Sequence, residues 1–346
     1  MPKVLVIATS SKTRGGITSV VNAHRKGAQW EKYNCKWIET HIDTNKFMSL
    51  CYLFIGYLKF LFHLPTAKIL HIHLSQPVSA IRKLLFFIPA YFCRKKIIVH
   101  FHAFSTETTI NSSSKWIYRF IFSRAKKVIV LSNSWKEAVY KAFNINNIEI
   151  VYNPCATIIG STEYAKKKNI LYAGTINERK GYADMIRAFA KIAAEHKEWK
   201  IVFAGNGEIE EGKSLAKELG IEEQTLFLGW LNGEKKDKAF KEASIFCLPS
   251  YFEGFPMAVL DAWTYELPVI TTPVGGITDI AKHKENMLVF TPGDTEKLAE
   301  CMQMLIEDNE LYNKIKAASI HFAKETFNIE VINKQIEKIY DEIAKM

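Results

Sequence analysis

The sequence predicts an α/β protein built from two Rossmann-like halves, each with a parallel sheet covered by helices. Short apolar runs alternate with amphipathic stretches along the whole chain, which is the pattern that such sheets and helices produce. The length of 346 residues suits about two domains, and 48% of the residues are hydrophobic. Because charged residues make up an ordinary 24%, we expect a globular chain with a sizeable core in each half.

The apolar runs predict the positions of the strands. In the first half we expect strands at Val4–Ala8, Ile69–His73, Ile97–Phe101, Val128–Leu131 and Ile148–Val151. In the second half we expect them at Ile170–Ala173, Ile201–Ala204, Thr225–Leu228, Ile245–Leu248, Val269–Thr271 and Met287–Phe290. Helices are predicted between them, including Ser134–Phe143, Gly181–His196, Glu210–Leu219 and Thr295–Glu307. Ligands of such sheets bind beyond the carboxyl ends of the strands.

The boundary between the halves is expected in Cys155–Lys168, a mixture of Gly, Ser, Thr and Lys without a periodic pattern. We therefore assign residues 1–157 to the first domain and residues 158–328 to the second. A last helix, at about Ile329–Lys345, follows the completed second sheet.

The cysteines and the start of the chain indicate a cytoplasmic protein. The six cysteines are scattered and form no CxxC pair, which favours reduced thiols over a disulfide framework or a zinc site. The apolar run at Val4–Ala8 is too short and ends too abruptly for a signal peptide, so no secretion is expected.

The net charge of +10 is unevenly distributed. Residues 1–150 contain 22 Lys and Arg against 6 Asp and Glu, a balance of +16, whereas residues 151–346 contain 24 against 30, a balance of −6. A basic half of this kind attracts nucleic acid, anionic lipid or diphosphate substrates. Because no helix-turn-helix, zinc finger or RNA-binding aromatic motif is present, we expect no nucleic-acid partner and prefer an anionic membrane surface.

The segment Ser250–Ala262 carries the most informative pattern. Glu253 lies on a Gly-containing turn after a buried strand, and Pro256 suits the first position of a helix that places Asp261 more than one turn along. Backbone amides at Gly254, Phe255 and Pro256's neighbours would attract an anion, and the two acids can accept hydrogen bonds from hydroxyls. The predicted ligand therefore has both phosphates and vicinal hydroxyls.

These residues, together with Leu267–Gly276, resemble the signature of family 4 retaining glycosyltransferases. The resemblance implies the GT-B fold, with two facing Rossmann-like domains and a central cleft. It implies that the first domain binds the acceptor, that the second binds the nucleotide sugar, and that the C-terminal helix, about 329–346, packs back onto the first domain. In the family, residues at the positions of Glu253 and Asp261 contact the donor sugar and the nucleotide ribose.

The chain departs from the family pattern at several positions. Asp261 stands where Glu is usual and is one methylene shorter. Thr175 stands where the family has Arg, and the resemblance implies that Lys180, with the adjacent Arg179, neutralises the leaving diphosphate. Glu266 stands where Gly is common.

Two Gly-rich turns complete the predicted donor contacts. Gly15 and Gly16 follow the first strand, where the family has a Gly pair under the donor phosphates, and Gly16 is the preferred contact. Gly205, Asn206 and Gly207 form a Gly-x-Gly turn that the family places close to the nucleotide. An ordinary structural turn is the alternative in both places.

Four histidines lie in pairs at alternating strand positions, His71 with His73 and His100 with His102, so each pair shares one face. His102 matches a family histidine near the donor sugar, whereas structural roles are expected for the other three. A four-histidine metal site is conceivable, but without an acidic partner cluster or a DxD motif we expect no metal ion and no cofactor.

Phe47–Leu64 is strongly apolar but is interrupted by Gly56, Lys59 and His63, which argues against a transmembrane helix. We expect a buried helix of the first sheet, with an interfacial membrane helix as the alternative. Ile81–Ile88 mixes apolar and basic residues in the manner of a surface that faces a membrane.

The sequence thus predicts a metal-independent retaining glycosyltransferase that takes its sugar from a nucleotide diphosphate sugar. The expected acceptor is a glycan or a lipid-diphosphate-linked glycan of cell-surface polysaccharide synthesis, such as capsule or exopolysaccharide, with the enzyme peripheral on the inner membrane face. A catalytically silent partner subunit and a nucleotide-sugar epimerase are the alternatives.

Overall fold

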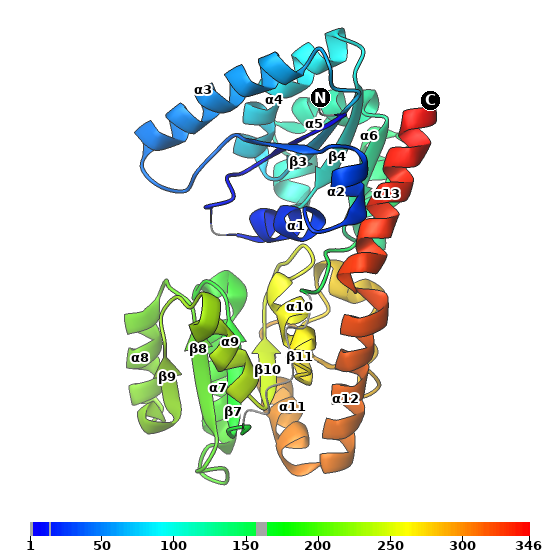
Figure 1. Cartoon of the computed structure of the whole chain (residues 1–346). Helices are drawn as coiled ribbons and strands as arrows, with labels where there is room; N and C mark the ends of the chain where they lie inside the picture. Colours follow the sequence, from blue (N-terminus) through cyan, green and yellow to red (C-terminus); the bar gives the residue numbers. More distant parts are fainter. Residues whose placement is uncertain (1–2, 14, 157–164) are drawn as a thin grey trace. The chain divides into compact units, whose positions relative to one another are not determined.

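The computed structural model describes residues 3–13, 15–156 and 165–346, and the chain divides into two compact units (Figure 1). Unit 1 comprises Met1–Pro154 and Ile329–Met346, and unit 2 comprises Cys155–Asn328. Each unit has a parallel six-stranded sheet covered by helices, which confirms the predicted fold class. The predicted boundary at residues 157 and 158 lies outside the described residues.

The sheet of unit 1 has the strand order β2-β1-β3-β4-β5-β6. Its strands are β1 (Val4–Ala8), β2 (Lys36–Glu39), β3 (Ile69–Leu74), β4 (Lys96–Phe101), β5 (Lys127–Val130) and β6 (Ile148–Ile150). Five of them match predicted strands within about one residue at each end, whereas β2 was not predicted. Because β2 lies at the sheet edge and buries only Ile38, it lacks the continuous apolar run that marks the other strands.

The helices of unit 1 follow the strands in alternation. They are α1 (Gly16–His24), α2 (Ala28–Lys32), α3 (Lys46–His63), α4 (Pro77–Phe92), a short π-helix at Thr106–Ile110, α5 (Lys115–Arg124), α6 (Asn133–Phe143) and α13 (Ile329–Lys345). The C-terminal helix α13 buries Ile332, Ile336, Ile339 and Ile343 in the same core cluster as strand β1. The three- and four-residue spacing of these isoleucines puts them on one face of the helix.

The sheet of unit 2 has the order β12-β11-β10-β7-β8-β9. Its strands are β7 (Asn169–Ala173), β8 (Lys200–Ala204), β9 (Thr225–Phe227), β10 (Ile245–Leu248), β11 (Val269–Thr271) and β12 (Leu288–Val289). The first three strands extend the sheet in one direction from β7, and the next three extend it in the other from β10. The direction therefore reverses between β7 and β10, where open α/β sheets bind their ligands.

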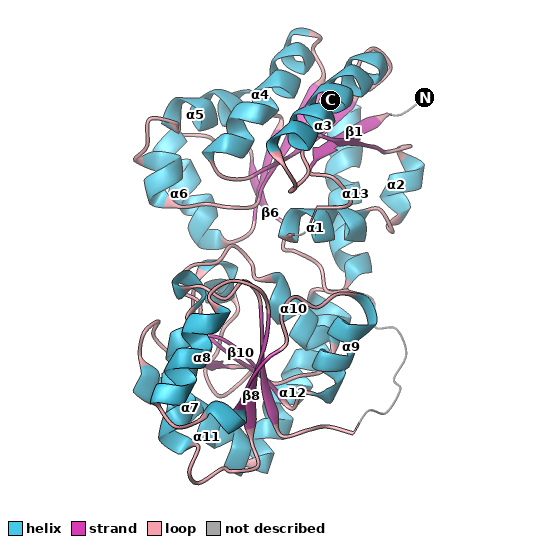
Figure 2. Cartoon of the chain, turned by 90° about the vertical axis from the view of Figure 1, so that its left-hand side faces the viewer, coloured by secondary structure: helices cyan, strands magenta, loops and turns pink. Residues whose placement is uncertain are grey.

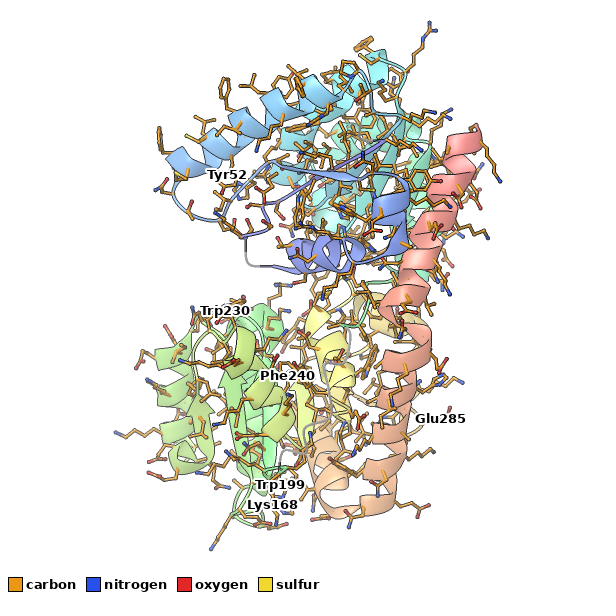
Figure 3. All side chains as sticks on the ribbon, viewed as in Figure 1. Tyr52, Lys168, Trp199, Trp230, Phe240 and Glu285 are labelled. Atoms are coloured by element: carbon orange, nitrogen blue, oxygen red, sulfur yellow. The ribbon has the colours of Figure 1, made fainter. Side chains whose placement is uncertain are left out.

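Helices cover both faces of this sheet (Figure 2). They are α7 (Tyr182–Ile192), α8 (Ile209–Glu218), α9 (Gly233–Glu242), α10 (Met257–Thr264), α11 (Thr295–Glu307) and α12 (Asn309–His321). Short 3₁₀-helices occur at Glu178–Lys180, Glu222–Gln224 and Gly275–Asp279, and a π-helix at Phe322–Thr326. Phe240 of α9 is fully buried and stacks on Phe246 and Tyr265, which ties this helix to the sheet (Figure 3).

The preferred interpretation of Phe47–Leu64 as a buried helix was wrong. The segment forms α3, but this helix buries only Gly56 and Phe60. Large apolar side chains along it are exposed, including Phe54 at 62% and Phe62 at 79%. The apolar composition of α3 therefore does not serve the core of unit 1. Among the helices of the described residues, none combines the length and apolar character that a membrane crossing requires.

Candidate functional site

The loops that follow β7 and β10 form the centre of the candidate site in unit 2. These strands are neighbours and run parallel, so their carboxyl ends and the loops after them meet at one edge of the sheet. The loop after β7 carries Arg179 and Lys180, and the loop after β10 carries Glu253. The fold thus brings predicted site residues together that lie more than seventy positions apart.

Glu253 and Lys180 form an ion pair within this loop cluster. Glu253 is 8% exposed, and its Oε1 accepts hydrogen bonds from Lys180 Nζ and, at 2.8 Å, from Ser250 Oγ. Asn177 caps the 3₁₀-helix by accepting a hydrogen bond from the Lys180 backbone N–H at 3.1 Å, which orients the lysine. A partly buried carboxylate beside a cation is an arrangement that binds polar ligands with high specificity.

Backbone contacts lock the two loops to each other. Arg179 accepts a hydrogen bond from the Tyr251 N–H through its carbonyl and donates one from Nη1 to the Phe252 carbonyl, both at 2.9 Å. Gly181 has a φ of 70°, and a Cβ there would lie 2.1 Å from the Pro249 carbonyl oxygen. A residue other than glycine would therefore push the loops apart. Arg179 holds the Glu253 loop in place, and its predicted contact with a diphosphate stays a prediction.

Helix α10 begins directly after this loop. Pro256 is its N-cap and not its first residue as predicted, and no side chain caps its first turn. Phe255 is 3% exposed and contacts Phe327 at 5.1 Å between ring centroids, so its side chain anchors the loop in the core. The Gly254 carbonyl accepts a hydrogen bond from the Gly276 N–H at 2.7 Å. The first turn of α10 thus presents backbone amides beside Glu253, as an anion site requires.

Asp261 lies on α10 and pairs with a lysine that the sequence analysis did not identify. Its Oδ2 lies 2.6 Å from Lys236 Nζ on α9. Burial raises the pKa of Asp261, and the Lys236 ammonium opposes that rise. The predicted ribose carboxylate is therefore held next to a cation.

The Gly-x-Gly turn after β8 packs against the loop after β7. A Cβ on Gly205 would lie 1.7 Å from the Gly174 carbonyl oxygen, and one on Gly207 would lie 2.1 Å from that of Ile176. Asn206 Oδ1 accepts a hydrogen bond from the Trp230 N–H at 2.9 Å. Close packing of two loops explains both glycines, and their contact with a nucleotide stays a prediction.

In unit 1, Gly15 and Gly16 follow β1, next to the position where the strand order reverses between β1 and β3. Gly15 is the N-cap of α1 with a φ of 145°, and Gly16 is the first residue of this helix. No side chain caps the helix, so its first amides have no side-chain acceptor at the N-cap. This geometry suits an anion, which is the role that the resemblance implies for the pair.

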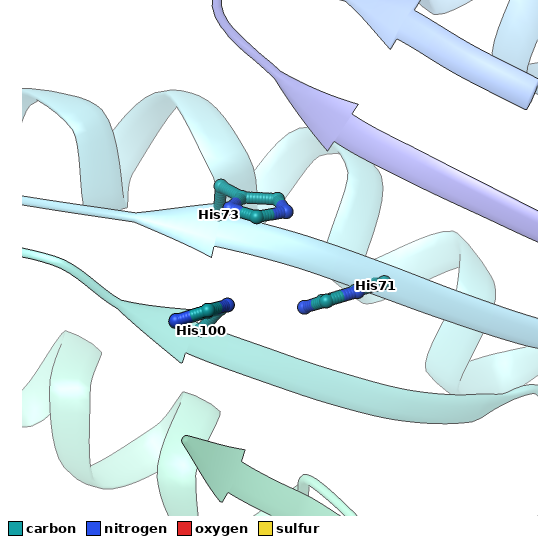
Figure 4. A group of neighbouring side chains, drawn as sticks. All are labelled: His71, His73 and His100. Atoms are coloured by element: carbon teal, nitrogen blue, oxygen red, sulfur yellow. The ribbon is translucent and has the colours of Figure 1, made fainter. Parts of the chain in front are cut away.

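The paired histidines gather on β3 and β4, with His71 near the middle of β3 and the other three at or just after the carboxyl ends. Figure 4 shows His71 and His73 on β3 and His100 on the neighbouring strand β4, and their ligand nitrogens lie within 4.8 Å of one another. His102 Nε2 lies 2.8 Å from His73 Nδ1, and burial lowers the pKa of His102 to about 3. The rings are therefore neutral near pH 7. They have the donor atoms that a metal ion would need, and the expectation that none binds stays a prediction.

Two residues of the candidate site were missed by the sequence analysis. Ser250 is fully buried and donates a hydrogen bond to Glu253. Its position three residues before Glu253 was the signal in the sequence that could have identified it. Lys236 sits in the charged run Glu234–Lys238, where nothing distinguishes it from a solvent-exposed residue. Its pairing with Asp261 depends on how α9 and α10 pack.

The family described as Glycosyl transferases group 1 matches residues 156–322, which is most of unit 2. An uncharacterized glycosyltransferase of Haemophilus influenzae is 31% identical over 212 residues, or 60% of this chain and 58% of that protein. A lipopolysaccharide 1,6-galactosyltransferase of Salmonella typhimurium is 27% identical over 194 residues, or 53% of each chain. The chain thus spans less than two thirds of the length of these relatives.

The fold resembles solved structures over its whole length. The Anabaena HepE structure in complex with UDP and glucose has a TM-score of 0.77 at 18% identity and covers 99% of this chain and 100% of its own. At this identity the likeness concerns the fold alone. With its two Rossmann-like units and its likeness to solved structures, the chain has the GT-B fold, and residues 156–322 are similar to the group 1 glycosyl transferases.

Proposed function

We propose that the chain is a retaining glycosyltransferase that moves a sugar from a nucleotide diphosphate sugar to a glycan or lipid-linked acceptor. The observation that carries this proposal is the Glu253–Lys180 pair on the adjoining loops after β7 and β10. The pair lies where the strand order of the sheet reverses, which is the position at which open α/β sheets bind ligands.

The donor would bind to unit 2. Ser250 and Lys180 both contact Oε1 of Glu253, and Oε2 has no hydrogen-bond partner among the described residues. Oε2 can therefore accept a hydrogen bond from a sugar hydroxyl. Lys180 has three N–H donors and can bind a phosphate oxygen while it holds Glu253. The amides that begin α10 add a further anion contact, and Asp261 would accept hydrogen bonds from the ribose.

In the proposed reaction the bond between the sugar C1 and the diphosphate oxygen breaks as the acceptor oxygen bonds to C1 on the same face. The acceptor proton passes to the departing phosphate oxygen, so the configuration at C1 is retained. Lys180, Arg179 and the α10 amides stabilise the charge that grows on the diphosphate, and Glu253 favours the cationic sugar centre. These groups supply the positive charge, and the proposal requires no metal ion.

Unit 1 would bind the acceptor. His102 is neutral because burial lowers its pKa, so it can serve as a hydrogen-bond partner for a sugar or acceptor hydroxyl. The amides at Gly15 and Gly16 would bind phosphate. The similarity to a lipopolysaccharide galactosyltransferase supports an acceptor from cell-surface polysaccharide synthesis.

A peripheral association with an anionic membrane is part of the proposal. The basic balance of residues 1–150 and the exposed apolar side chains of α3 support it. Extraction of native membranes with high salt tests it, because an electrostatically held protein is released. Recovery of the entire protein in the soluble fraction at low salt would contradict it.

A thermal-shift screen with a panel of nucleotide sugars tests the donor proposal. One donor should raise the melting temperature, because a ligand at about 100 times its Kd stabilises the folded state by about 2.7 kcal/mol. Structures of HepE with UDP and glucose make uridine diphosphate sugars the first to try. A protein that no nucleotide sugar stabilises would be the silent partner, and sugar interconversion without an acceptor would indicate an epimerase.

A further inference from the structure

A pocket of about 580 Å³ lies within unit 1, between α3, α4 and the loop that precedes α3. None of the residues that line it is among those proposed to bind the donor. One wall is apolar and the other end carries charged groups. This combination differs from an ordinary surface depression and matches a ligand with two chemically different parts.

The apolar wall comes from facing helices. Leu50 and Leu53 of α3 lie opposite Val78, Ile81 and Leu85 of α4. The last three recur at spacings of three and four residues and so share one face of their helix. Leu50, Val78, Ile81 and Leu85 are all exposed.

Beyond the pocket, further large apolar side chains continue the exposed surface of both helices. They include Phe47, Phe54 and Phe62 on α3 and Ile88 and Phe92 on α4. Many exposed apolar side chains on two neighbouring helices mark a site of interaction, since proteins rarely leave large apolar patches in water.

The polar end of the pocket is dominated by cations. Arg82 lines it, and the Nε atom of Arg82 is buried without a hydrogen-bond partner among the described residues. Lys46 lines it too, and His41 Nε2 lies 2.8 Å from Asp43 Oδ1. The neighbouring Lys83 is buried and donates to Thr40 Oγ1. Two cationic side chains, Arg82 and Lys46, thus line this end of the pocket together with the single acid Asp43.

We propose that this pocket binds an anionic membrane lipid, with the lipid phosphate at Arg82 and the hydrocarbon chain along Leu53, Ile81 and Leu85. The excess of cations complements the phosphate, and the exposed apolar residues of α3 and α4 complement the acyl region of the bilayer. A soluble phosphate compound would leave the apolar wall in water. The inference deepens the proposed membrane association by naming the surface and the ligand.

Flotation of the full-length chain with vesicles tests the proposal. The chain should float with vesicles of phosphatidylcholine and phosphatidylglycerol in a ratio of about 70 to 30, and much less with phosphatidylcholine alone. Arg82→Gln should weaken binding about fivefold, the effect of one basic residue at an anionic surface. Leu85→Asp should weaken it about tenfold or more, because it removes apolar burial and adds a repelled charge.

Two matched variants in unit 2 are the controls. Leu226→Asp changes an exposed leucine and Lys213→Gln an exposed cation outside the pocket, so both should bind vesicles like the wild type. The proposal is overturned if the wild type stays unbound, if it binds neutral vesicles equally well, or if Arg82→Gln and Leu85→Asp both bind normally. Self-association through α3 in place of flotation would also overturn it.

The donor screen separates this inference from the proposed function. A wild type that fails to float but is stabilised by a nucleotide sugar would overturn only the lipid site. A wild type that floats but neither binds nor transfers a sugar would overturn the proposed function and leave the lipid site standing.

Discussion

At the scale of single residues, the candidate site depends on pairs of opposite charge that the fold assembles. Glu253 is held by Lys180 and Ser250, and Asp261 is held by Lys236. Each carboxylate is thereby oriented before a ligand arrives, which is the preorganisation that recognition of hydroxyls requires. The shorter side chain of Asp261 is placed by a cation from the neighbouring helix.

Lys236→Met tests whether the Lys236 cation strengthens the binding of the nucleotide. Burial raises the pKa of Asp261 and Lys236 opposes the rise, so the variant should raise that pKa further. A protonated carboxyl accepts a ribose hydroxyl poorly, so the Kd for a nucleoside diphosphate should rise about fivefold, and more at low pH than at high pH. Titration calorimetry across a pH series measures this.

Lys238→Met is the matched control, since Lys238 lies on the same helix and its recorded ion pair is with Glu242 and not with Asp261. A lower Kd in Lys236→Met would mean that Lys236 competes with the ribose for Asp261. That result would contradict the assigned role.

At the scale of elements, glycines allow loops from different strands to approach each other. Gly181 joins the 3₁₀-helix that carries Lys180 to α7 and lies close to Pro249 at the start of the loop after β10. Because Lys180 directly precedes it, any shift of this junction moves the lysine away from Glu253. Loop geometry and ion-pair geometry are therefore coupled.

Gly181→Ala should lower both stability and donor binding. Its φ of 70° and the 2.1 Å approach of a Cβ to Pro249 O combine backbone strain with a clash. We expect a loss of about 2 kcal/mol or more in the free energy of unfolding. Gly220→Ala isolates the strain, because Gly220 has a φ of 69° and nothing within 4 Å of a Cβ. It should cost about 1 kcal/mol and leave donor binding intact.

Urea denaturation and nucleotide titration of both variants measure these effects. Equal losses in the free energy of unfolding of the two variants would show that the contact with Pro249 is unimportant. Intact donor binding in Gly181→Ala would show that the geometry at Gly181 does not control the position of Lys180.

The helices and strands also explain which features of the fold and the site could be predicted from the sequence. Buried parallel strands such as β1 and β10 are continuous apolar runs, so periodicity alone locates them. The edge strand β2 and the exposed helix α3 were misjudged because their patterns reflect an edge and an apolar surface, not a core. Lys236 could not be found, since its partner Asp261 is set by packing between helices. Glu253 and Lys180 were found through their motifs, and their mutual contact required the structure.

At the scale of the whole molecule, ionisable groups are divided unequally between the units. The five histidines His24, His71, His73, His100 and His102 all belong to unit 1, and burial lowers the pKa of each. His24 Nδ1 lies 2.8 Å from Asn333 Oδ1, which links α1 to the C-terminal helix. Unit 1 is therefore the part of the chain that should respond to mild acid.

The chain should lose stability as the pH falls from 7 to 5. Burial lowers the pKa of His24 from 6.5 to about 4, so the unfolded state takes up a proton first, and stability present above pH 6.5 is lost as the pH falls toward 4. This histidine alone should account for about 2 kcal/mol between pH 7 and pH 5. His24→Gln, which can still bond to Asn333, should reduce the loss by that amount.

His321→Gln is the control, because His321 is exposed on α12. Urea denaturation at both pH values measures the difference. If His24→Gln and the wild type lost equal stability, the neutral buried state of His24 would be contradicted.

The central claim is that Glu253 serves sugar transfer from a nucleotide diphosphate sugar. The most direct test measures transfer of labelled sugar to a membrane-lipid extract by wild type and Glu253→Gln, with Glu210→Gln on the exposed face of α8 as the control. Wild type and control should transfer sugar, and Glu253→Gln should be slower by about a hundredfold or more while it keeps the wild-type melting temperature within about 3 °C. Equal transfer by Glu253→Gln and wild type would contradict the account.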